Sequence, residues 1–314
     1  MADTRADPPS PTSPPHGALA RAERFVRLTA RVLEQHLFAH HFRGGGTAPV
    51  ETALDAYRAG GGGYGHGLDP GLRGPAGRPP HAAYALRVLD AVGRCDSRRA
   101  EDVCRHLTSV STADGALPAL RPVRRGHPDA SFVPAGDDPP GDLLVTGPVV
   151  GLLHRNEVWH AWLFRATDFC WRAVEALEEP HPCEVEAAVA FLDHAPDRAR
   201  ARAAADRLGA LVRERRIAAA GPGGPHPYPV APGHAPDADH FPHDYAPTPH
   251  SLARAWFTDE EMARSLDFLA AGQREDGGWP VRGRRWAPGP SREARPVVTI
   301  EALRTLVAYG RPVD

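Results

Sequence analysis

Residues 268–280 constrain the fold of this chain more than any other stretch, because they join a helix end to a glycine-marked turn. Apolar side chains recur at helical spacing before the turn, and Thr258 followed three residues later by Glu261 is typical of a capping box. Gly277 and Gly278 can end the helix, since glycine adopts left-handed backbone angles without a steric penalty. The pattern therefore predicts a helix from about residue 258 to these glycines.

The residues around the glycines indicate how the turn is held. Gln273 can hydrogen-bond the backbone groups that a helix end leaves unpaired, and Trp279 can anchor the loop by burying its indole ring. A second helix is predicted at about 296–309, where apolar side chains again share one face. The predicted unit is a helical hairpin joined by a Gln-x-x-Asp-Gly-Gly-Trp turn.

Degenerate copies of this turn occur earlier in the chain. Tyr64, Leu117 and Tyr228 follow glycines in the way that Trp279 does. Their spacing is about 50 residues, except that the gap between Leu117 and Tyr228 is about twice as long. We interpret the long gap as a repeat that lost its glycine turn near residues 171–174.

The repeat length predicts the fold class. About 50 residues accommodate two helices and two loops, no alternating strand pattern is visible, and six such hairpins need about 300 residues. We therefore predict an all-α fold, an α/α toroid of the (α/α)6 type, as one domain over residues 18–312. Residues 1–17 are rich in Pro, Ser, Thr and Asp and are expected to form a disordered tail. Further helices are predicted at about 18–41, 49–57, 79–93, 98–110, 145–154, 159–177, 182–194 and 197–214.

The hairpin unit resembles a known repeat. Residues 268–279 match the repeat of squalene–hopene cyclases, oxidosqualene cyclases and protein prenyltransferase β-subunits: an aromatic-Leu pair, three residues, a Gln, a short spacer, then Gly and Trp. Residues 63–70, 169–172, 184–192 and 240–245 resemble bacterial proteins labelled prenyltransferases for their squalene-cyclase-type repeat. The resemblance implies a terpenoid-cyclase toroid, in which the repeat motif braces helices.

The catalytic motifs of those families are only partly present. Class II terpene cyclases protonate an alkene with the middle aspartate of Asp-x-Asp-Asp, and residues 237–240 keep only the first two aspartates. The Asp-Asp-x-x-Asp motif of class I cyclases fails at residues 137–141. Protein prenyltransferases bind zinc through Asp, Cys and His, and no cysteine here has that pattern, although His181 precedes Cys183. The resemblance therefore leaves the activity open.

Composition excludes several function classes. The net charge is −2 without a basic stripe, so no nucleic-acid partner is predicted. Every basic residue counted among the 37 is arginine, which excludes lysine Schiff-base chemistry and a Walker lysine. No run of about 18 apolar residues predicts a membrane span, although peripheral membrane contact is compatible with the sequence. Reduced cysteines in a cytoplasmic protein are expected, since no Cys-x-x-Cys occurs at Cys95, Cys104, Cys170 or Cys183.

Candidate site residues gather in three loops that a toroid would place at the mouths of its cavity. A carboxyl group in an apolar cavity has a raised pKa and can act as an acid, a histidine can direct its proton, and aromatic faces stabilise cations. The predicted catalytic residues are Asp69, His66, Asp239, His240 and Asp244, with Asp69 and Asp239 as the acids. The predicted substrate-binding residues are Tyr64, Arg73, Tyr245, Trp279 and Trp286.

A simpler interpretation stands beside this one. Asp69 before Pro70 can cap a turn, and the His- and Pro-rich loop can be a solvated lid. If the loops are equivalent turns of a ring, residues 64–73 and 237–245 should emerge at the same mouth of the cavity.

Cofactor sites are not predicted. The glycines at 60–65 formally match Gly-x-Gly-x-x-Gly, but no strand precedes them and Pro70 follows. The histidines and aspartates of the loop ending at His250 include zinc ligand types at loose spacing, so no metal is assigned. No Gly-x-Ser-x-Gly occurs, which disfavours a serine hydrolase.

Three functions remain open. The first is a terpene-cyclase-like enzyme acting on an isoprenoid or an isoprenoid-bearing natural product, by acid-initiated cyclisation or related carbocation chemistry. The second is a lyase or hydrolase acting on saccharides: two carboxylates ~5–10 Å apart across the cavity would favour a hydrolase, and a Tyr/His/Arg cluster without such a pair would favour a lyase. The third is a non-catalytic binding module that lost the acid motif, which a collapsed cavity would favour.

Overall fold

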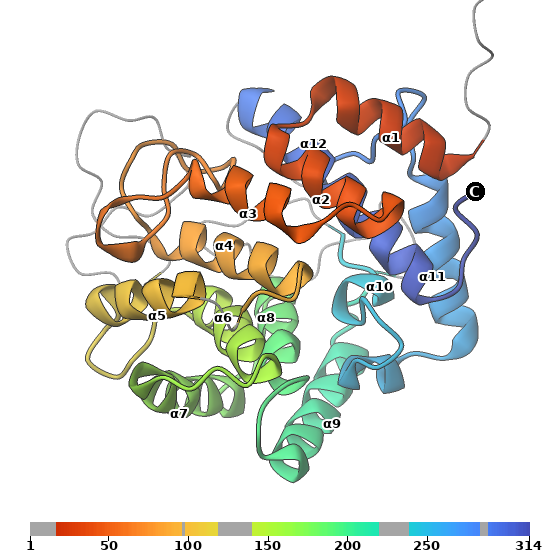
Figure 1. Ribbon diagram of the computed structural model, residues 1–314. Coiled ribbons are helices and arrows are strands. Elements are labelled where there is room, and N and C mark those ends of the chain that lie inside the picture. The colour runs from red at the N-terminus through yellow and green to blue at the C-terminus, as the bar shows by residue number, and fades with distance from the viewer. Residues whose placement is uncertain (1–16, 96–97, 119–139, 220–238, 283–287) are drawn as a thin grey trace, which may run out of the picture.

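The computed structural model describes residues 17–95, 98–118, 140–219, 239–282 and 288–314. Within these ranges every regular element is a helix (Figure 1). Two isolated β-bridges, Arg58 with Tyr64 and Pro118 with Gly141, lie in the segments between helices. The predicted fold class is confirmed. None of the described helices is long and apolar enough to span a membrane.

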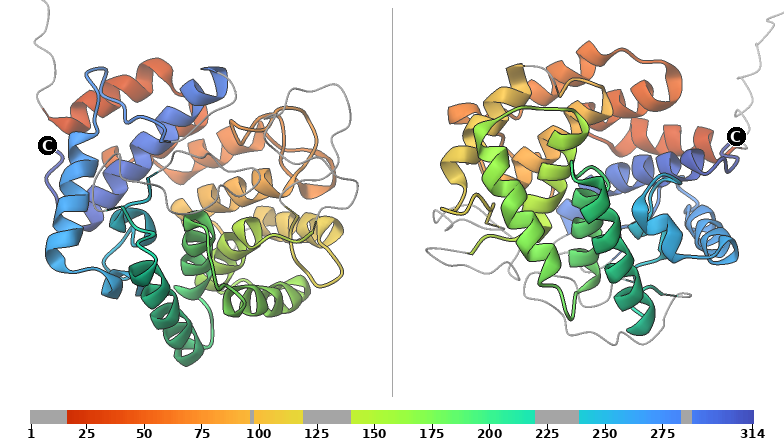
Figure 2. Two further views of the ribbon diagram at one scale, coloured as in Figure 1. Left: turned by 180° about the vertical axis from the view of Figure 1, so that it is seen from behind. Right: turned by 90° about the horizontal axis from the view of Figure 1, so that it is seen from below.

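The helices alternate between an outer and an inner position around a ring. The described α-helices are α1 (Ala18–Thr29), α2 (Val32–Arg43), α3 (Thr47–Asp55), α4 (Pro79–Ala91), α5 (Arg98–Val110), α6 (Leu143–Arg155), α7 (Ala161–Glu175), α8 (Pro182–Leu192), α9 (Arg198–Glu214), α10 (Pro242–Tyr245), α11 (Asp259–Ala271) and α12 (Pro288–Ala308). Two 3₁₀ turns, η1 (Gly60–Gly62) and η2 (Leu252–Trp256), complete them. Helices α4, α6, α8, α10 and α12 line the centre, α2 packs between α12 and α4, and the odd-numbered helices lie outside, except that the C-terminal end of α11 also reaches the centre. The first and last hairpins meet through α1 and α12, so the ring closes (Figure 1, Figure 2).

Close packing sets the direction of the inner helices. A Cβ atom on Gly147 of α6 would lie 2.6 Å from the carbonyl oxygen of Ala187 in α8, and one on Gly151 would lie 2.0 Å from that of Ala190. Only glycine permits this approach. The residue numbers rise together along both helices, so α6 and α8 run parallel, and their N-terminal ends face the same mouth of the ring.

The glycine turns fasten each hairpin to the next. A Cβ atom on Gly62 would lie 2.7 Å from the backbone of Asp102 in α5, and one on Gly115 the same distance from that of Ala166 in α7. The third copy, Gly277, packs on α1, the outer helix of the first hairpin, where a Cβ atom would lie 2.2 Å from the Arg21 carbonyl oxygen. All three glycines have positive φ. The turn motif therefore joins neighbouring repeats and closes the ring.

Gln273 and Trp279 hold the last turn in place. The Gln273 amide donates to the carbonyls of Ala18, at 2.8 Å, and Gly277, at 2.9 Å, and its oxygen accepts from Arg21. Trp279 is 2% exposed, and its indole N–H donates to the Leu269 carbonyl oxygen at 2.6 Å. The structural role predicted for both residues is confirmed.

Three details of the sequence prediction are wrong. The helix predicted at 18–41 is two helices, because Ala30 and Arg31 are extended and Arg31 instead donates to the Gly67 carbonyl oxygen at 2.7 Å. Helix α11 ends at Ala271, before the paired glycines. The repeat without a glycine turn has its short connection at residues 176–181, whereas 171–174 lie inside α7.

Some predictions concern residues that the structure does not describe. Residues 1–16, Tyr228 and Trp286 are outside the described residues. The limits of the domain, 18–312, stay a prediction, although the backbone N–H of Leu19 donates to the Val313 carbonyl oxygen at 2.6 Å and so joins the two ends of that range.

Replacing Trp279 by alanine should lower the free energy of unfolding by ~3–5 kcal/mol, because it removes a buried indole and its hydrogen bond at the closure of the ring. Chemical denaturation followed by circular dichroism measures this loss. A midpoint equal to that of the unmodified protein would contradict the bracing role.

Gly277→Ala should destabilise the protein more than Gly310→Ala. Both glycines have positive φ, at 91° and 67°, but only Gly277 has backbone within reach of a new methyl group. Gly310→Ala should cost about 1 kcal/mol from left-handed strain alone. Equal losses in paired urea titrations would show that the contact with α1 does not hold the ring.

Candidate functional site

A cavity of about 700 Å³ occupies the centre of the ring. This size suits a small-molecule ligand. Inner helices α4, α6, α8, α10 and α12 line it, together with α11 and the turn after it. The lining residues are Arg87, Asp90, Leu152, Arg155, Glu186, His243, Asp244, Pro247, Thr248, Phe268, Leu269, Gly272, Trp279, Pro280, Val281, Arg282, Val298, Glu301, Ala302, Arg304, Thr305 and Ala308.

The cavity wall has two zones of different character. Apolar and aromatic side chains gather on α11, on α12 and on the turn between them; they are Phe268, Leu269, Trp279, Val281 and Val298. Charged side chains gather at the C-terminal ends of α4 and α6, and Arg155 pairs there with Asp90 at 3.3 Å. Glu186 lies just before the middle of α8, level with Gly147 of α6, which is about 12 Å along the helix axis from Arg155.

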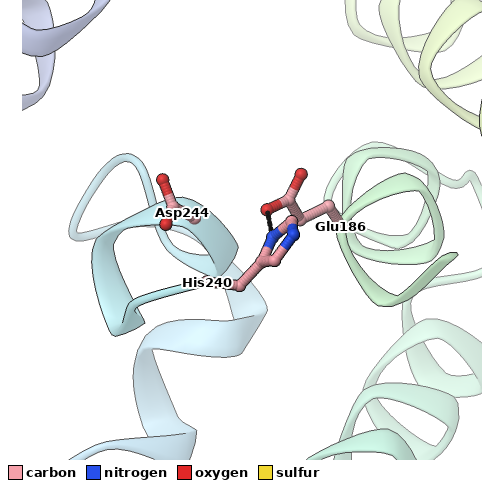
Figure 3. Close-up of side chains that lie close together, drawn as sticks. All are labelled: Glu186, His240 and Asp244. Carbon is pink, nitrogen blue, oxygen red and sulfur yellow. Dashed lines mark hydrogen bonds and ion pairs between the residues drawn. The ribbon is translucent and has the colours of Figure 1, made fainter. Parts of the chain in front are cut away.

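Three ionisable side chains meet at the N-terminal mouth of the ring. Glu186 projects from α8, while His240 precedes α10 and Asp244 lies within it; His240 contacts Glu186, and Asp244 lies beside them (Figure 3). The His240 Nδ1 lies 2.5 Å from the Glu186 Oε1. One ligand atom from each of the three residues lies within 4.8 Å of the others. The Glu186 side chain is 35% exposed, so it is accessible from the cavity.

Local capping explains why α8 and α10 present these side chains. His181 accepts a hydrogen bond from the Cys183 backbone N–H at 3.2 Å, and Glu184 accepts one from the His181 N–H at 2.8 Å. This capping box starts α8 at Pro182, four residues before Glu186. At α10, Asp244 accepts a hydrogen bond from the Phe241 backbone N–H at 2.8 Å.

Asp244 is held as an anion by a guanidinium. Arg282 donates through both terminal nitrogens, one of them at 2.7 Å from the Asp244 Oδ2. Burial alone would raise the pKa of the Asp244 carboxyl, but His243 and Arg282 outweigh it and lower that pKa. Burial lowers the pKa of His243, so that imidazole is neutral near pH 7. Arg282 also donates to the Asp239 carbonyl oxygen at 3.3 Å.

Glu186 and His240 hold their protons more tightly than usual. Burial raises the pKa of the Glu186 carboxyl to about 7, against the opposing effect of His240. Burial alone would lower the pKa of His240, but its contacts with Cys183 and Glu186 raise it to about 10. Glu186 therefore titrates near neutral pH and His240 well above it, beside a carboxylate that stays ionised. Two carboxyl groups whose pKa values are pushed apart are a typical acid and base arrangement.

The same three residues carry ligand types that divalent cations accept. Glu186 and His240 share a proton, however, and Asp244 is neutralised by Arg282. A cation would have to displace both partners, so the donor set is already satisfied within the protein.

The structure brings part of the predicted site together. Of the predicted residues, Asp244 and Trp279 line the cavity, and His240 joins Asp244 in the cluster. Asp239 is half-buried, and its backbone carbonyl oxygen accepts a hydrogen bond from Arg282. Tyr245 is buried, with its ring centroid 6.2 Å from that of His240.

The loop at residues 64–73 is placed differently. Asp69 accepts a hydrogen bond from the Gly71 N–H at 2.7 Å, and its own N–H donates to His81 at 3.0 Å, as in a capped turn. Arg73 pairs with Glu293 at 2.8 Å. Tyr64 is fully buried, and His66 is exposed. The loop precedes α4 and so lies toward the N-terminal ends of the inner helices, but none of its predicted residues is among those lining the cavity.

Sequence reasoning missed Glu186 and Cys183. Residues 182–192 read as an apolar helix, and Glu186 is the acid at its centre, where core packing would favour an aliphatic side chain. A carboxyl group in such a position was the available signal. Its partner His240 is distant in sequence, so the pairing could not be inferred.

Comparisons with known proteins support the fold. No protein-family model matches the chain, and no curated protein matches it significantly. A crystal structure of a protein from Actinoplanes is similar at a TM-score of 0.53 and 19% identity, covering 92% of this chain and 89% of that one. The type II terpene cyclase MstE from Scytonema is similar at 0.53 and 15%, covering 92% and 88%. A variant of that cyclase in complex with its product, merosterolic acid A, gives 0.50 and 13%, covering 93% and 86%. The chain has a terpene-cyclase-like fold.

His240 should remain protonated at pH 8, and Glu186→Gln should lower its pKa. A raised pKa means that this proton's contribution to stability is complete below pH 6.5 and is lost as the pH rises through about 10. Nitrogen-detected NMR of the imidazoles measures the protonation state of His240 at pH 8 and the change of its pKa in the variant. His194, whose pKa burial lowers, should be neutral at pH 8 in both proteins and serves as the control. A neutral His240 at pH 8 would contradict the ion pair.

Proposed function

We propose that the protein is a terpene-cyclase-like enzyme that starts carbocation chemistry by protonating an isoprenoid or isoprenoid-bearing compound in the central cavity. The observation that carries the proposal is Glu186, a carboxyl group with a raised pKa, at the mouth of a cavity with one apolar and aromatic wall. The fold shared with a type II terpene cyclase supports it as a matter of architecture.

The site supplies each element of such a reaction. Protonated Glu186 donates its proton to an alkene carbon, the π electrons form the new C–H bond, and the adjacent carbon becomes cationic. Phe268 and Trp279 line the space in which the cation would form, and aromatic faces stabilise desolvated cations by ~1–2 kcal/mol each. Loss of a proton from carbon ends the reaction, and the Glu186–His240 pair is reprotonated from solvent.

The roles of the predicted residues follow from this. The protonated His240 donates through its Nδ1 to the Glu186 carboxyl, at 2.5 Å, and holds it in position. The ionised Asp244 carboxylate, held in place by Arg282, lies at the cavity in which the cation would develop. Asp239, which matches the middle aspartate of the class II motif, orients Arg282 through its carbonyl oxygen. In this proposal the acid is Glu186, and Asp69 caps its own turn.

A saccharide-acting hydrolase is the second candidate, because Glu186 and Asp244 offer two carboxylates with ligand atoms within 4.8 Å. Retaining glycosidases hold theirs about 5–5.5 Å apart, with one protonated and one ionised. The charged zone around Arg87 and Arg155 also suits a polar ligand better than a hydrocarbon. A cavity of about 700 Å³ counts against the non-catalytic module, for which a collapsed centre was expected.

The test is turnover of prenylated substrates. Incubation with farnesyl- and geranylgeranyl-bearing arenes should give isomers of unchanged mass, and in D₂O each product should gain deuterium at the protonated carbon. Glu186→Gln should abolish turnover with an unchanged melting temperature. Glu178→Gln, the same change on the exposed surface, should leave turnover intact. Turnover of aryl glycosides without any prenyl product would replace the proposal by the hydrolase.

Turnover should also fall as the pH rises through about 7. The acid form of Glu186 is the reactive one, and its pKa is raised to about 7, so the ionised form predominates above that value. A pH–rate profile measured from pH 5 to 9 provides the check. Activity that increases with pH across this range would assign Glu186 the role of a base.

A further inference from the structure

The other ring nitrogen of His240 faces a thiol. The Cys183 Sγ lies 3.8 Å from the His240 Nε2, while the Nδ1 lies 2.5 Å from the Glu186 Oε1. One imidazole thus bridges a thiol and a carboxylate through its two nitrogens, as the base does in nucleophilic triads. We propose that Cys183, His240 and Glu186 form a nucleophilic site that accepts an acyl group from an ester or thioester.

The backbone places these groups by local rules. Cys183 and Glu186 are three residues apart on α8, so they share one face of the helix. Cys183 lies in the first turn, where the positive end of the helix dipole favours a thiolate. His240 approaches that face from the segment before α10.

The other three cysteines show what an inert thiol is like in this protein. Cys95, Cys104 and Cys170 are at most 2% exposed. Burial raises the pKa of Cys104 to about 11 and moves that of Cys170 further still from neutrality. Cys183 differs from them in being partly exposed and in facing a histidine.

Other ionisable groups around the site come from three segments. His181 precedes α8, with its ring 6.3 Å from that of His240. Asp244 and Tyr245 lie on α10, and Arg282 follows the last glycine turn. The Asp244 charge is offset by Arg282, so Glu186 and the thiol itself are the groups that keep His240 protonated.

The reaction needs only the acyl donor and water. The Cys183 thiolate attacks the carbonyl carbon of the acyl donor, and the bond to the alcohol or thiol leaving group breaks as the carbonyl re-forms. His240 gives its proton to the leaving group. Water, deprotonated by His240, then attacks the thioester and releases the acid. Cys183 transfers no proton in the reaction proposed above, so either proposal can fail alone.

Alkylation by iodoacetamide tests the thiolate. The purified full-length protein is labelled from pH 5 to 10 and mapped by peptide mass spectrometry. Cys183 should react at pH 6 at a rate near its plateau, whereas an ordinary thiol of pKa about 8.5 would be mostly protonated there. His240→Gln should slow labelling at pH 6 by about tenfold or more. The buried cysteines, unlabelled until denaturant is added, show that the protein stays folded.

A single ionisation near pH 8.5 at Cys183 would overturn the proposal, and the unmodified protein alone decides this if His240→Gln fails to fold. Acyl transfer is tested with p-nitrophenyl acetate and p-nitrophenyl octanoate. A burst of nitrophenol together with a hydroxylamine-labile acyl group on Cys183, absent from Cys183→Ala, is expected. A reactive thiolate that gives neither burst nor acyl-enzyme would exclude the acyl-accepting role.

Discussion

Closure of the ring at Gly277 is the contact on which the rest of the structure depends. The turn around it packs on the backbone of α1 so closely that a Cβ atom would lie 2.2 Å from the Arg21 carbonyl oxygen. Gln273 adds a hydrogen bond to the Ala18 carbonyl oxygen, 255 residues away in the chain. Equivalent contacts join the earlier hairpins, and this one brings the first and last repeats together. Without it the central cavity would have no continuous wall.

The fifth hairpin determines what that cavity can do. Its inner helix, α10, has four residues, whereas α8 has 11 and α12 has 21. The short helix brings His240 and Asp244 against α8 and leaves the Glu186 carboxyl 35% exposed. The shortest of the inner helices thus creates the most reactive surface of the cavity.

The features that recur along the sequence, the helices and the glycine turns, could be predicted, whereas the contacts that occur once could not. The helices, the ring and the roles of Gln273 and Trp279 follow from local periodicity and a recurrent turn. No glycine or proline marks the break at Ala30. There Arg31 donates a hydrogen bond to the Gly67 carbonyl oxygen in a distant loop, and the local sequence does not reveal such a contact. Asp69 and Asp239 were chosen as acids from their neighbours in sequence. The acid favoured by the structure, Glu186, depends on a tertiary contact with His240 that no local pattern reveals.

The electrostatics of the cluster explain why one carboxyl group is protonated and its neighbour is not. Asp244 has a guanidinium partner, so its negative charge persists and disfavours a second one nearby. Glu186 is paired with His240, which it shares with Cys183, and burial raises the pKa of Glu186 to about 7. A proton on Glu186 is therefore available near neutral pH, while a proton on His240 is shared between the carboxyl and the thiol. A bound ligand that excluded water from Glu186 would favour its protonated form further, and so coupling between occupancy and acidity follows from the arrangement of these groups.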